Sequence, residues 1–254
     1  MSGPRYRLIA LHGFLGQASD WDGLAPRFPD AVLSALDLWP IVGDPGVSDW
    51  PSLARDLDRA IRDARGGLDG VPAFLVAYSF GARLALAIDD LGSADGAVCG
   101  CCLVSCSPGL PWDDRDLRAR RRASDEAWAE RIVRAPEDEI WRAWDAQPVL
   151  AGSARPQRRE GLPAPRATLA RTLRLFSLAD QPDHRARLLT WRAPLLWVTG
   201  SADTTFTAIA GELSDAGVAA EFVTCAQAGH RVPWDNPSGF ARIVRDWVDR
   251  CLSR

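Results

Sequence analysis

Six short, near-continuously apolar runs separated by amphipathic stretches constrain this 254-residue chain more than any other feature. A strand is apolar on both faces when helices cover both sides of its sheet, and amphipathic crossovers are typical of parallel strands. The runs span residues 7–11, 31–38, 73–78, 97–105, 194–199 and 220–224, and an amphipathic stretch at 237–251 follows them. The pattern therefore predicts an α/β fold with a mostly parallel sheet flanked by helices.

A long segment with helical spacing separates the fourth apolar run from the fifth. It contains no strand-like run, and several prolines divide it, as expected of short helices joined by turns. The expected helices span residues 114–133, 137–145 and 167–178. We expect residues 109–192 to form a helical cap inserted between two parts of the sheet domain, 1–108 and 193–254. A separate helical domain is the alternative.

The apolar run at 73–78 leads directly into Ser79-Phe-Gly81 and then into a stretch rich in alanine and leucine. A strand, a tight turn carrying a serine and a helix together form a nucleophile elbow, which exposes the serine at the carboxyl edge of the sheet. Ala77 replaces the first glycine of the usual Gly-x-Ser-x-Gly pattern, and Ala82 follows Gly81. The surrounding pattern predicts the elbow despite this weaker motif.

A serine needs a histidine that accepts its proton and a carboxylate that orients the histidine. His230 follows the last predicted strand and Asp203 follows the one before it, so the chain order is serine, aspartate, histidine. This order is the one found in α/β hydrolases. We predict that Ser79, Asp203 and His230 form a catalytic triad. The alternative is a helix-capping Asp203 with a structural His230.

The stretch from Leu11 to Gly16, which follows the first predicted strand, matches the loop that supplies one amide of an oxyanion hole. The backbone N–H groups of Phe14 and of Phe80, the residue after the serine, are predicted to stabilise negative charge on a substrate oxygen. His12 is predicted to hold the turn of this loop. His184, in the predicted cap, is expected at the surface.

Three stretches of the predicted cap are more specific than the elbow and histidine motifs, which many esterases share. They are residues 121–129, 144–149 and 176–183. Together with 11–16, Trp21, 78–83 and 203–206, they make the chain resemble, nearly end to end, the 2-succinyl-6-hydroxy-2,4-cyclohexadiene-1-carboxylate synthases of menaquinone biosynthesis. The resemblance implies an α/β-hydrolase fold and a carbon–oxygen lyase that eliminates pyruvate from 2-succinyl-5-enolpyruvyl-6-hydroxy-3-cyclohexene-1-carboxylate. Ser79 would then act as the base that abstracts the substrate proton.

Arg83 stands four residues after Ser79, so both side chains share one face of the predicted helix. A guanidinium on a small, apolar helix costs desolvation free energy unless it meets an anion, and its planar shape suits a carboxylate. We predict that Arg83 binds a substrate carboxylate, with a structural salt bridge as the alternative.

The resemblance implies further binding residues in and near the cap. Arg121 is the second expected carboxylate ligand, although Arg120 and Arg122 stand beside it. Tyr78 and Trp144 are expected to line the pocket, unless Trp144 belongs to the apolar core of the cap with Trp128 and Trp141. For a further cap arginine of the family, Arg159 or its neighbour Arg158 is the candidate.

Charge is unevenly distributed along the chain, whose formal net charge is −3. Residues 109–192 hold 17 arginines against 13 acidic residues, which indicates a small anionic substrate with several carboxylates. The isoelectric point of 5.7 and the absence of a basic stripe exclude nucleic acid as an expected partner.

The apolar runs are all too short for a membrane span, and no secretory signal precedes them, so a cytoplasmic location is expected. Cys99, Cys101, Cys102 and Cys106 lie in or beside one apolar run, which is typical of cysteines in a buried strand. We therefore expect neither a metal nor a cofactor.

Two other functions remain open from the sequence. A serine carboxylesterase or a carbon–carbon bond hydrolase would use the same triad on a small carboxylate-bearing substrate, with Ser79 as nucleophile. A catalytically silent binding protein of the same fold is the other alternative, although such a protein usually loses a triad residue.

Overall fold

The computed structural model describes residues 3–66, 70–93, 96–151, 153 and 161–254. Within them, six strands form one sheet in the order β2-β1-β3-β4-β5-β6, and every neighbouring pair is parallel. The strands are β1 (Tyr6–Leu11), β2 (Ala31–Leu36), β3 (Ala73–Tyr78), β4 (Cys101–Val104), β5 (Leu195–Gly200) and β6 (Glu221–Cys225). The predicted α/β fold with a parallel sheet is confirmed.

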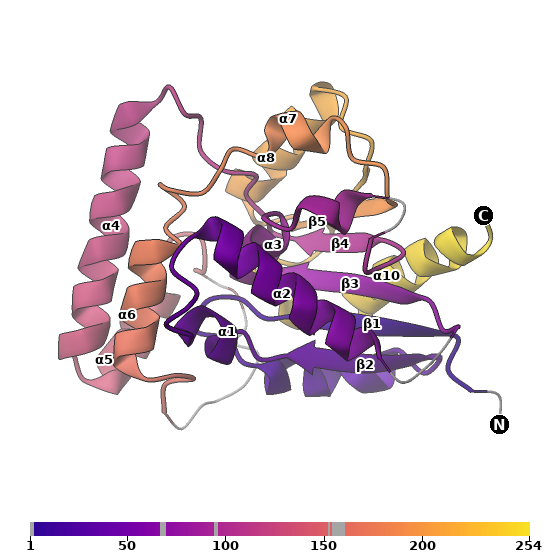
Figure 1. Cartoon of the computed structure of the whole chain (residues 1–254), viewed down its shortest axis with the longest axis horizontal. Helices are drawn as coiled ribbons and strands as arrows, with labels where there is room; N and C mark the ends of the chain where they lie inside the picture. The colour runs from indigo at the N-terminus through magenta and orange to yellow at the C-terminus, as the bar shows by residue number, and fades with distance from the viewer. Residues whose placement is uncertain (1–2, 67–69, 94–95, 152, 154–160) are drawn as a thin grey trace.

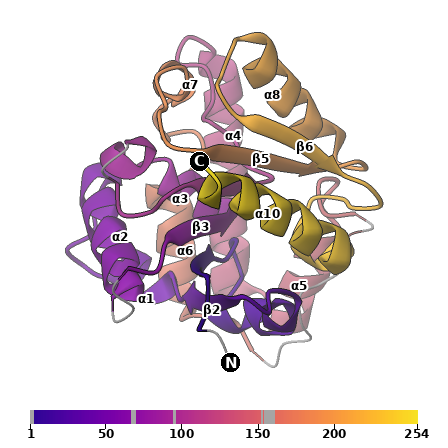
Figure 2. The same cartoon turned by 90° about the vertical axis from the view of Figure 1, so that its right-hand side faces the viewer.

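Alternate residues of each central strand enter two separate apolar cores. In β3, Leu75 and Ala77 belong to one core, whereas Phe74 and Val76 belong to the other. Helices α2 (Trp50–Arg65) and α3 (Phe80–Ala85) cover the first face, and η1 (Ala18–Arg27) and α10 (Pro237–Leu252) cover the second (Figure 2). This coverage on both faces explains why the central strands are apolar throughout.

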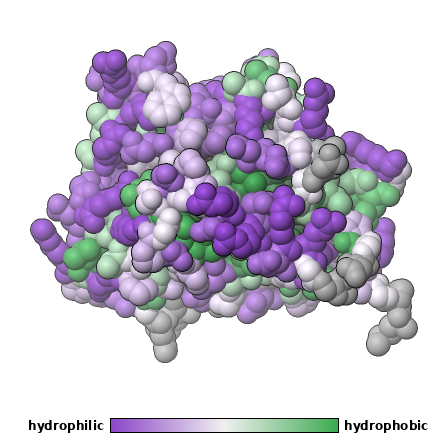
Figure 3. All heavy atoms as spheres, viewed as in Figure 1, coloured by the Kyte–Doolittle hydropathy of each residue, from purple (hydrophilic) through white to green (hydrophobic). Residues whose placement is uncertain are grey.

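Helix α2 begins at a residue with local capping chemistry. The Asp49 side chain accepts a hydrogen bond from the backbone N–H of Ser52, and α2 then buries Leu53, Leu57 and Ile61 at helical spacing. Its other side is polar and contributes to a mostly hydrophilic face of the molecule (Figure 3). The remaining elements on the sheet side are α1 (Trp39–Gly43), η2 (Asp89–Gly92), α8 (Thr204–Asp215) and α9 (Val232–Asp235).

Four helices lie between β4 and β5 in the sequence. They are α4 (Arg115–Arg134), α5 (Glu137–Asp145), α6 (Arg166–Leu175) and α7 (Arg185–Leu188). Figure 1 shows α4, α5 and α6 as a group beyond the carboxyl ends of the strands. The predicted helix at 167–178 ends earlier, at Leu175, because Ser177 begins a turn in which its carbonyl accepts from the N–H groups of Asp180 and Gln181.

The apolar run predicted as a strand at 97–105 forms a strand only at Cys101–Val104. Ala97 and Val98 are buried outside the strand, whereas Cys99 is exposed. Gly100 lies so close to the Pro194 carbonyl that a Cβ there would be 3.0 Å from its oxygen. Cys99 and Gly100 still hydrogen-bond to the backbone of Ala73 and Leu75, so the segment joins the edge of the sheet just before the strand begins.

Burial explains the chemistry of the other clustered cysteines. Cys101 packs into one core and Cys102 into the other, and burial raises the pKa of both thiols.

In the described part of the chain, no cluster of three or more His, Cys, Asp or Glu side chains could hold a metal ion. None of the helices described is both long and apolar enough to cross a membrane.

Candidate active site

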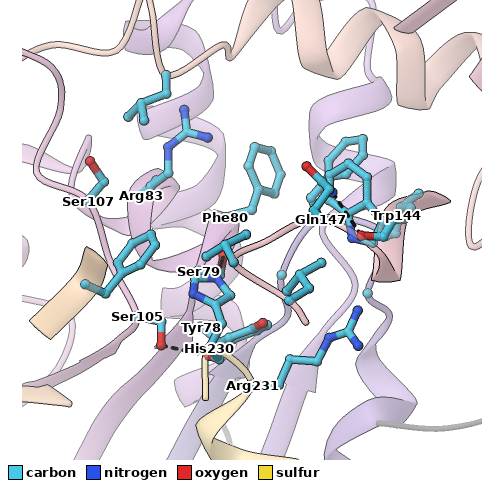
Figure 4. A pocket seen from close by; sticks show the side chains of 18 of the residues that line it. Tyr78, Ser79, Phe80, Arg83, Ser105, Ser107, Trp144, Gln147, His230 and Arg231 are labelled. Atoms are coloured by element: carbon cyan, nitrogen blue, oxygen red, sulfur yellow. Dashed lines mark hydrogen bonds between the residues drawn. The ribbon is translucent and has the colours of Figure 1, made fainter. Parts of the chain in front are cut away.

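A cavity of about 400 Å³ lies between the carboxyl edge of the sheet and helices α4 to α6 (Figure 4). The sheet side contributes Gly13, Phe14, Tyr78, Ser79, Phe80, Arg83, Ser105 and His230 to its lining. The helical side contributes Arg121, Asp125, Trp141, Trp144, Asp145, Gln147, Thr172 and Leu173. Two parts of the chain that are distant in sequence therefore enclose one site.

Ser79 lies on a strained turn between β3 and α3. Its φ of 51° and ψ of −109° are unusual for a residue with a Cβ, and the turn is held by a hydrogen bond from the Ser79 N–H to the Val104 carbonyl at 2.8 Å. A Cβ on Gly81 would lie 2.6 Å from the His12 carbonyl oxygen, so glycine is required there. Ala77, which replaces the usual glycine, is fully buried. The predicted turn geometry is present.

Ser79, His230 and Asp203 form one hydrogen-bonded line. Ser79 Oγ lies 3.0 Å from His230 Nε2, and His230 Nδ1 lies 2.7 Å from Asp203 Oδ2. With Nδ1–H donating to the carboxylate, Nε2 accepts the hydrogen bond of the serine hydroxyl. Asp203 also caps α8, because its Oδ1 accepts from the Phe206 N–H at 3.2 Å. The same carboxylate thus caps α8 and hydrogen-bonds His230.

Ser105 fixes the loop that carries His230. Its hydroxyl donates to the His230 carbonyl at 2.8 Å, and its own backbone has a positive φ of 48° at the end of β4. The Phe206 ring lies 4.6 Å from the His230 ring. Ser105 could not be predicted from the sequence, since a serine at a strand end has no distinguishing local signal.

The loop after β1 and the start of α3 carry the two amides predicted for the oxyanion hole, those of Phe14 and Phe80. Phe14 and Phe80 both line the cavity, and among the described residues neither backbone N–H has a protein acceptor. A Cβ on Gly13 would lie 2.6 Å from the Tyr78 ring, so the close approach of the loop requires glycine. His12 Nε2 accepts from the Leu38 N–H at 3.0 Å, and Nδ1 donates to the Gly13 carbonyl at 2.9 Å. His12 therefore holds the loop, as predicted.

Arg83 faces the cavity with neutral hydrogen-bond partners. Its Nε donates to Gln181 Oε1 at 2.6 Å, and its Nη2 donates to the Phe176 carbonyl at 2.8 Å. In the described part of the chain, no carboxylate forms an ion pair with it, so the predicted alternative of a structural salt bridge finds no partner. Burial first, and the charge of Arg121 second, lower the pKa of Arg83 to about 9.

Arg121 also reaches the cavity, but with a carboxylate partner of its own. Its Nε lies 2.9 Å and 3.0 Å from the two oxygens of Asp125, one turn along α4. Asp125 accepts a further hydrogen bond from Ser177 Oγ at 2.6 Å. Arg122 pairs with Asp180 away from the cavity. The positive charge of Arg121 is thus partly neutralised within the protein.

Tyr78 and Trp144 line the cavity as predicted. The Tyr78 ring lies 5.7 Å from the His230 ring, and burial raises the pKa of its hydroxyl. The Trp144 ring lies 5.2 Å from Phe14 and 4.9 Å from Trp128, so Trp144 joins the cavity wall to the packing of the helices. Arg159 and Arg158 lie outside the described residues.

Comparisons with known proteins identify the family. The model of the alpha/beta hydrolase family matches residues 8–243. The 2-succinyl-6-hydroxy-2,4-cyclohexadiene-1-carboxylate synthase of Salmonella agona (strain SL483) is 34% identical over 248 residues, covering 94% of this chain and 93% of its own length. The chain belongs to this synthase family. The resemblance inferred from the cap stretches is therefore confirmed.

Solved structures show the same fold as this synthase-family chain. MenH from S. aureus covers 99% of the chain and 96% of itself with a TM-score of 0.82 at 20% identity. A thermophilic esterase from Thermogutta terrifontis covers 98% of the chain and 92% of itself with a TM-score of 0.68 at 19% identity. At these identities the likeness establishes the fold.

Arg231 is a cavity residue of the synthase-family chain that the sequence analysis did not identify. It is 7% exposed, and its Nη2 donates to Asp145 Oδ1 at 2.6 Å, which joins the His230 loop to the end of α5. Its position directly after the predicted catalytic histidine was the only signal in the sequence. The partner, 86 residues away, could not be inferred from local pattern.

His184 corrects a prediction. The sequence pattern predicts a surface position, but His184 is only 7% exposed. Its backbone N–H donates to the Pro108 carbonyl, which holds the residue against the protein before α7. Burial first, and the charge of Arg187 second, lower the pKa of His184 to about 4. The imidazole is therefore neutral at neutral pH.

Proposed function

We propose that this chain is a 2-succinyl-6-hydroxy-2,4-cyclohexadiene-1-carboxylate synthase, which eliminates pyruvate from 2-succinyl-5-enolpyruvyl-6-hydroxy-3-cyclohexene-1-carboxylate. One observation carries the proposal: the hydrogen-bonded Ser79, His230 and Asp203 share a cavity with Arg83, a cation without an ion-pair partner among the described residues. A triad serves many reactions, whereas a cation of this kind favours a substrate that brings its own carboxylate. The 34% identity to curated synthases supports the same assignment.

Ser79 acts as the base in the proposed reaction. His230 Nε2 accepts the hydroxyl proton of Ser79, and Asp203 stabilises the resulting imidazolium through Nδ1. The serine oxygen then removes the proton from the ring carbon that bears the succinyl group. The electron pair forms a ring double bond next to that carbon, the existing double bond shifts, and the carbon–oxygen bond to the enolpyruvyl group breaks. The released enol becomes pyruvate, and no water is consumed.

The amides of Phe14 and Phe80 stabilise the charge that this step creates. Removal of a proton beside the succinyl ketone places negative charge on the ketone oxygen. Two N–H groups held by the loop after β1 and by the start of α3 provide fixed donors for that oxygen. The chemistry needs neither a metal nor a cofactor, because the charge is spread onto an oxygen that these donors bind.

Arginines on both sides of the cavity bind the substrate carboxylates. Arg83 binds one carboxylate and Arg121 binds another, while Tyr78 and Trp144 shape the wall between them. Residues 109–192 act as a cap that closes the site over the carboxyl edge of the sheet and limits the access of water. Exclusion of water favours elimination over hydrolysis.

The experiment supplies the enolpyruvyl substrate and follows pyruvate release while the reaction runs in ¹⁸O-labelled water. We expect stoichiometric pyruvate and a ring product without a solvent oxygen. A serine carboxylesterase or carbon–carbon bond hydrolase would instead turn over a panel of simple aryl esters or place ¹⁸O in a product carboxylate. Absence of pyruvate, together with rapid ester hydrolysis that requires Ser79, would contradict the proposal.

A further inference from the structure

Gln181 is a fully buried residue to which the reaction proposed above assigns no role. It lies in the loop between α6 and α7 and contacts the site from behind Arg83. Its side-chain oxygen accepts from Arg83 Nε at 2.6 Å, and its side-chain nitrogen donates to the Ser107 carbonyl at 3.1 Å. These two partners fix the orientation of the amide, because only its oxygen can face the arginine and only its nitrogen can face the carbonyl.

Among the described residues, the hydrogen-bond partners of Arg83 are all uncharged. Besides Gln181, the guanidinium donates to the Phe176 carbonyl, and the Phe80 ring lies 5.8 Å from it. Asp125, whose charge reaches Arg83, is already hydrogen-bonded by Arg121 and Ser177. The acidic side chain in the neighbourhood is therefore engaged elsewhere, and the charge of Arg83 is left for another anion.

The amide at position 181 has an isosteric alternative, glutamate. A carboxylate there would form an ion pair with Arg83 and cancel its charge, and its second oxygen would face the Ser107 carbonyl instead of donating to it. Glutamine and glutamate occupy almost the same volume, so the difference between them at this buried position is one of charge and hydrogen bonding.

We propose that Gln181 is a positioning residue that makes the site selective for carboxylates, by holding the Arg83 guanidinium through a neutral contact that leaves its charge available to the ligand. The identity of that ligand rests on the proposed function. Gln181 Oε1, itself held in place by the Ser107 carbonyl on its amide nitrogen, and the Phe176 carbonyl accept from Arg83, whose other N–H groups are left for a ligand in the cavity that it lines. A substrate carboxylate thus meets an ordered cation instead of competing with a protein carboxylate.

The test measures the dissociation constant of 2-succinylbenzoate by calorimetry. This stable dicarboxylate carries the succinyl chain and the ring carboxylate but has no enolpyruvyl group. We expect Gln181→Glu to weaken binding about 10- to 100-fold, as for loss of a charge-assisted hydrogen bond. Gln181→Met removes the contact without adding a charge and should weaken binding less. Gln227→Glu is the matched control, since it makes the same charge change at an exposed turn and should bind like the wild type.

The outcomes separate this proposal from the proposed function. Equal binding by Gln181→Glu and the wild type would overturn it, even where pyruvate is released from the enolpyruvyl substrate. Weaker binding by Gln181→Met than by Gln181→Glu would show that packing and not charge matters, and so would overturn it too. Failure of the wild type to bind 2-succinylbenzoate would also overturn the proposal for Gln181. If Gln181→Glu fails to fold, the comparison of Gln181→Met with the wild type decides, with at least about threefold weakening expected.

Discussion

The carboxyl edge of the sheet and the helical segment above it face the same cavity but hold their polar groups differently. At the sheet edge, the side chains of Ser79, His230 and Asp203 hydrogen-bond to one another, and Asp203 also accepts from the Phe206 N–H. In the helical segment, Arg121 is paired with Asp125, and Arg122 and Arg174 are paired with Asp180 and Glu126. These arginines of residues 109–192 are thus engaged in ion pairs within the segment, and they contribute less positive charge to the cavity than a count of arginines indicates.

This difference indicates which region carries the proposed catalytic groups and which region carries cations that remain available to a ligand. The sheet edge provides a rigid frame in which the proposed base and its relay have fixed partners. Its Arg83 has no carboxylate ion-pair partner among the residues that the structure describes, whereas arginines of the helical segment such as Arg121 are partly neutralised. We therefore expect substitutions at the sheet edge to have the larger effects on activity.

The largest expected effect is that of His230→Ala. Without the imidazole, Ser79 loses the acceptor for its proton, so kcat for pyruvate release should fall about 1000-fold or more. Steady-state kinetics with the enolpyruvyl substrate measure kcat, and calorimetry with 2-succinylbenzoate should show unchanged binding. If His230→Ala retained the wild-type kcat, the sheet edge would not be the region that carries the catalytic groups.

Arg83 and Arg121 provide the next comparison, one arginine from each region. Arg83→Met should lower kcat/KM by about 30- to 1000-fold, because it removes the cation that we propose as a ligand of a substrate carboxylate and that has no ion-pair partner among the described residues. Arg121→Met should cost roughly tenfold, since Asp125 already neutralises part of its charge. Arg122→Met, which breaks a pair outside the cavity, is the control. The reverse order for Arg83 and Arg121 would place the main carboxylate site in the helical segment.

The ion pair of Arg231 and Asp145 connects the two regions. Arg231→Met leaves the charge of Asp145 without this partner in a half-buried place, so the free energy of unfolding should fall by about 3 kcal/mol. Urea denaturation measures the change. Arg142→Met breaks an exposed pair with Asp138 on the same helix, α5, and should cost less than about 0.5 kcal/mol. Equal costs would show that the connection does not contribute to stability.

The smallest expected effect concerns pH and the helical segment. Burial lowers the pKa of His184 from its ordinary value of 6.5 to about 4 in the folded protein. Between pH 6.5 and pH 4, therefore, the imidazole takes up a proton in the unfolded chain but not in the folded protein. The free energy of unfolding should therefore fall as pH drops below about 6.5, with 1 to 2 kcal/mol lost by roughly pH 5. Urea denaturation of the wild type and His184→Gln at pH 7.5 and pH 5 tests this. A variant with the same pH dependence as the wild type would exclude His184 as the cause.

Features that depend on neighbouring residues could be predicted from the sequence. Strand β3, the turn at Ser79 and helix α5 lie where the pattern placed them, because apolar period and turn chemistry are local. The hydrogen-bonded line through Asp203 and His230 could also be inferred, since the parallel strands before them end at the same edge of the sheet.

Features that depend on distant pairing could not be predicted. Gln181 lies 98 residues from Arg83, and Arg231 lies 86 residues from Asp145, so no local pattern indicates either contact. The same limit explains why His184 was placed at the surface and why the excess of arginine appeared more available than it is. Long-range partners decide whether a charged side chain is free to bind a ligand.

Pyruvate release by the wild type and by Ser79→Ala, measured side by side with the enolpyruvyl substrate, tests the central claim most directly. The account predicts that the wild type releases one pyruvate per substrate and that Ser79→Ala is at least about 1000-fold slower, because the proton-abstracting oxygen is lost. Both proteins should bind 2-succinylbenzoate with similar affinity. Equal rates for the two proteins, or no pyruvate from the wild type, would contradict it.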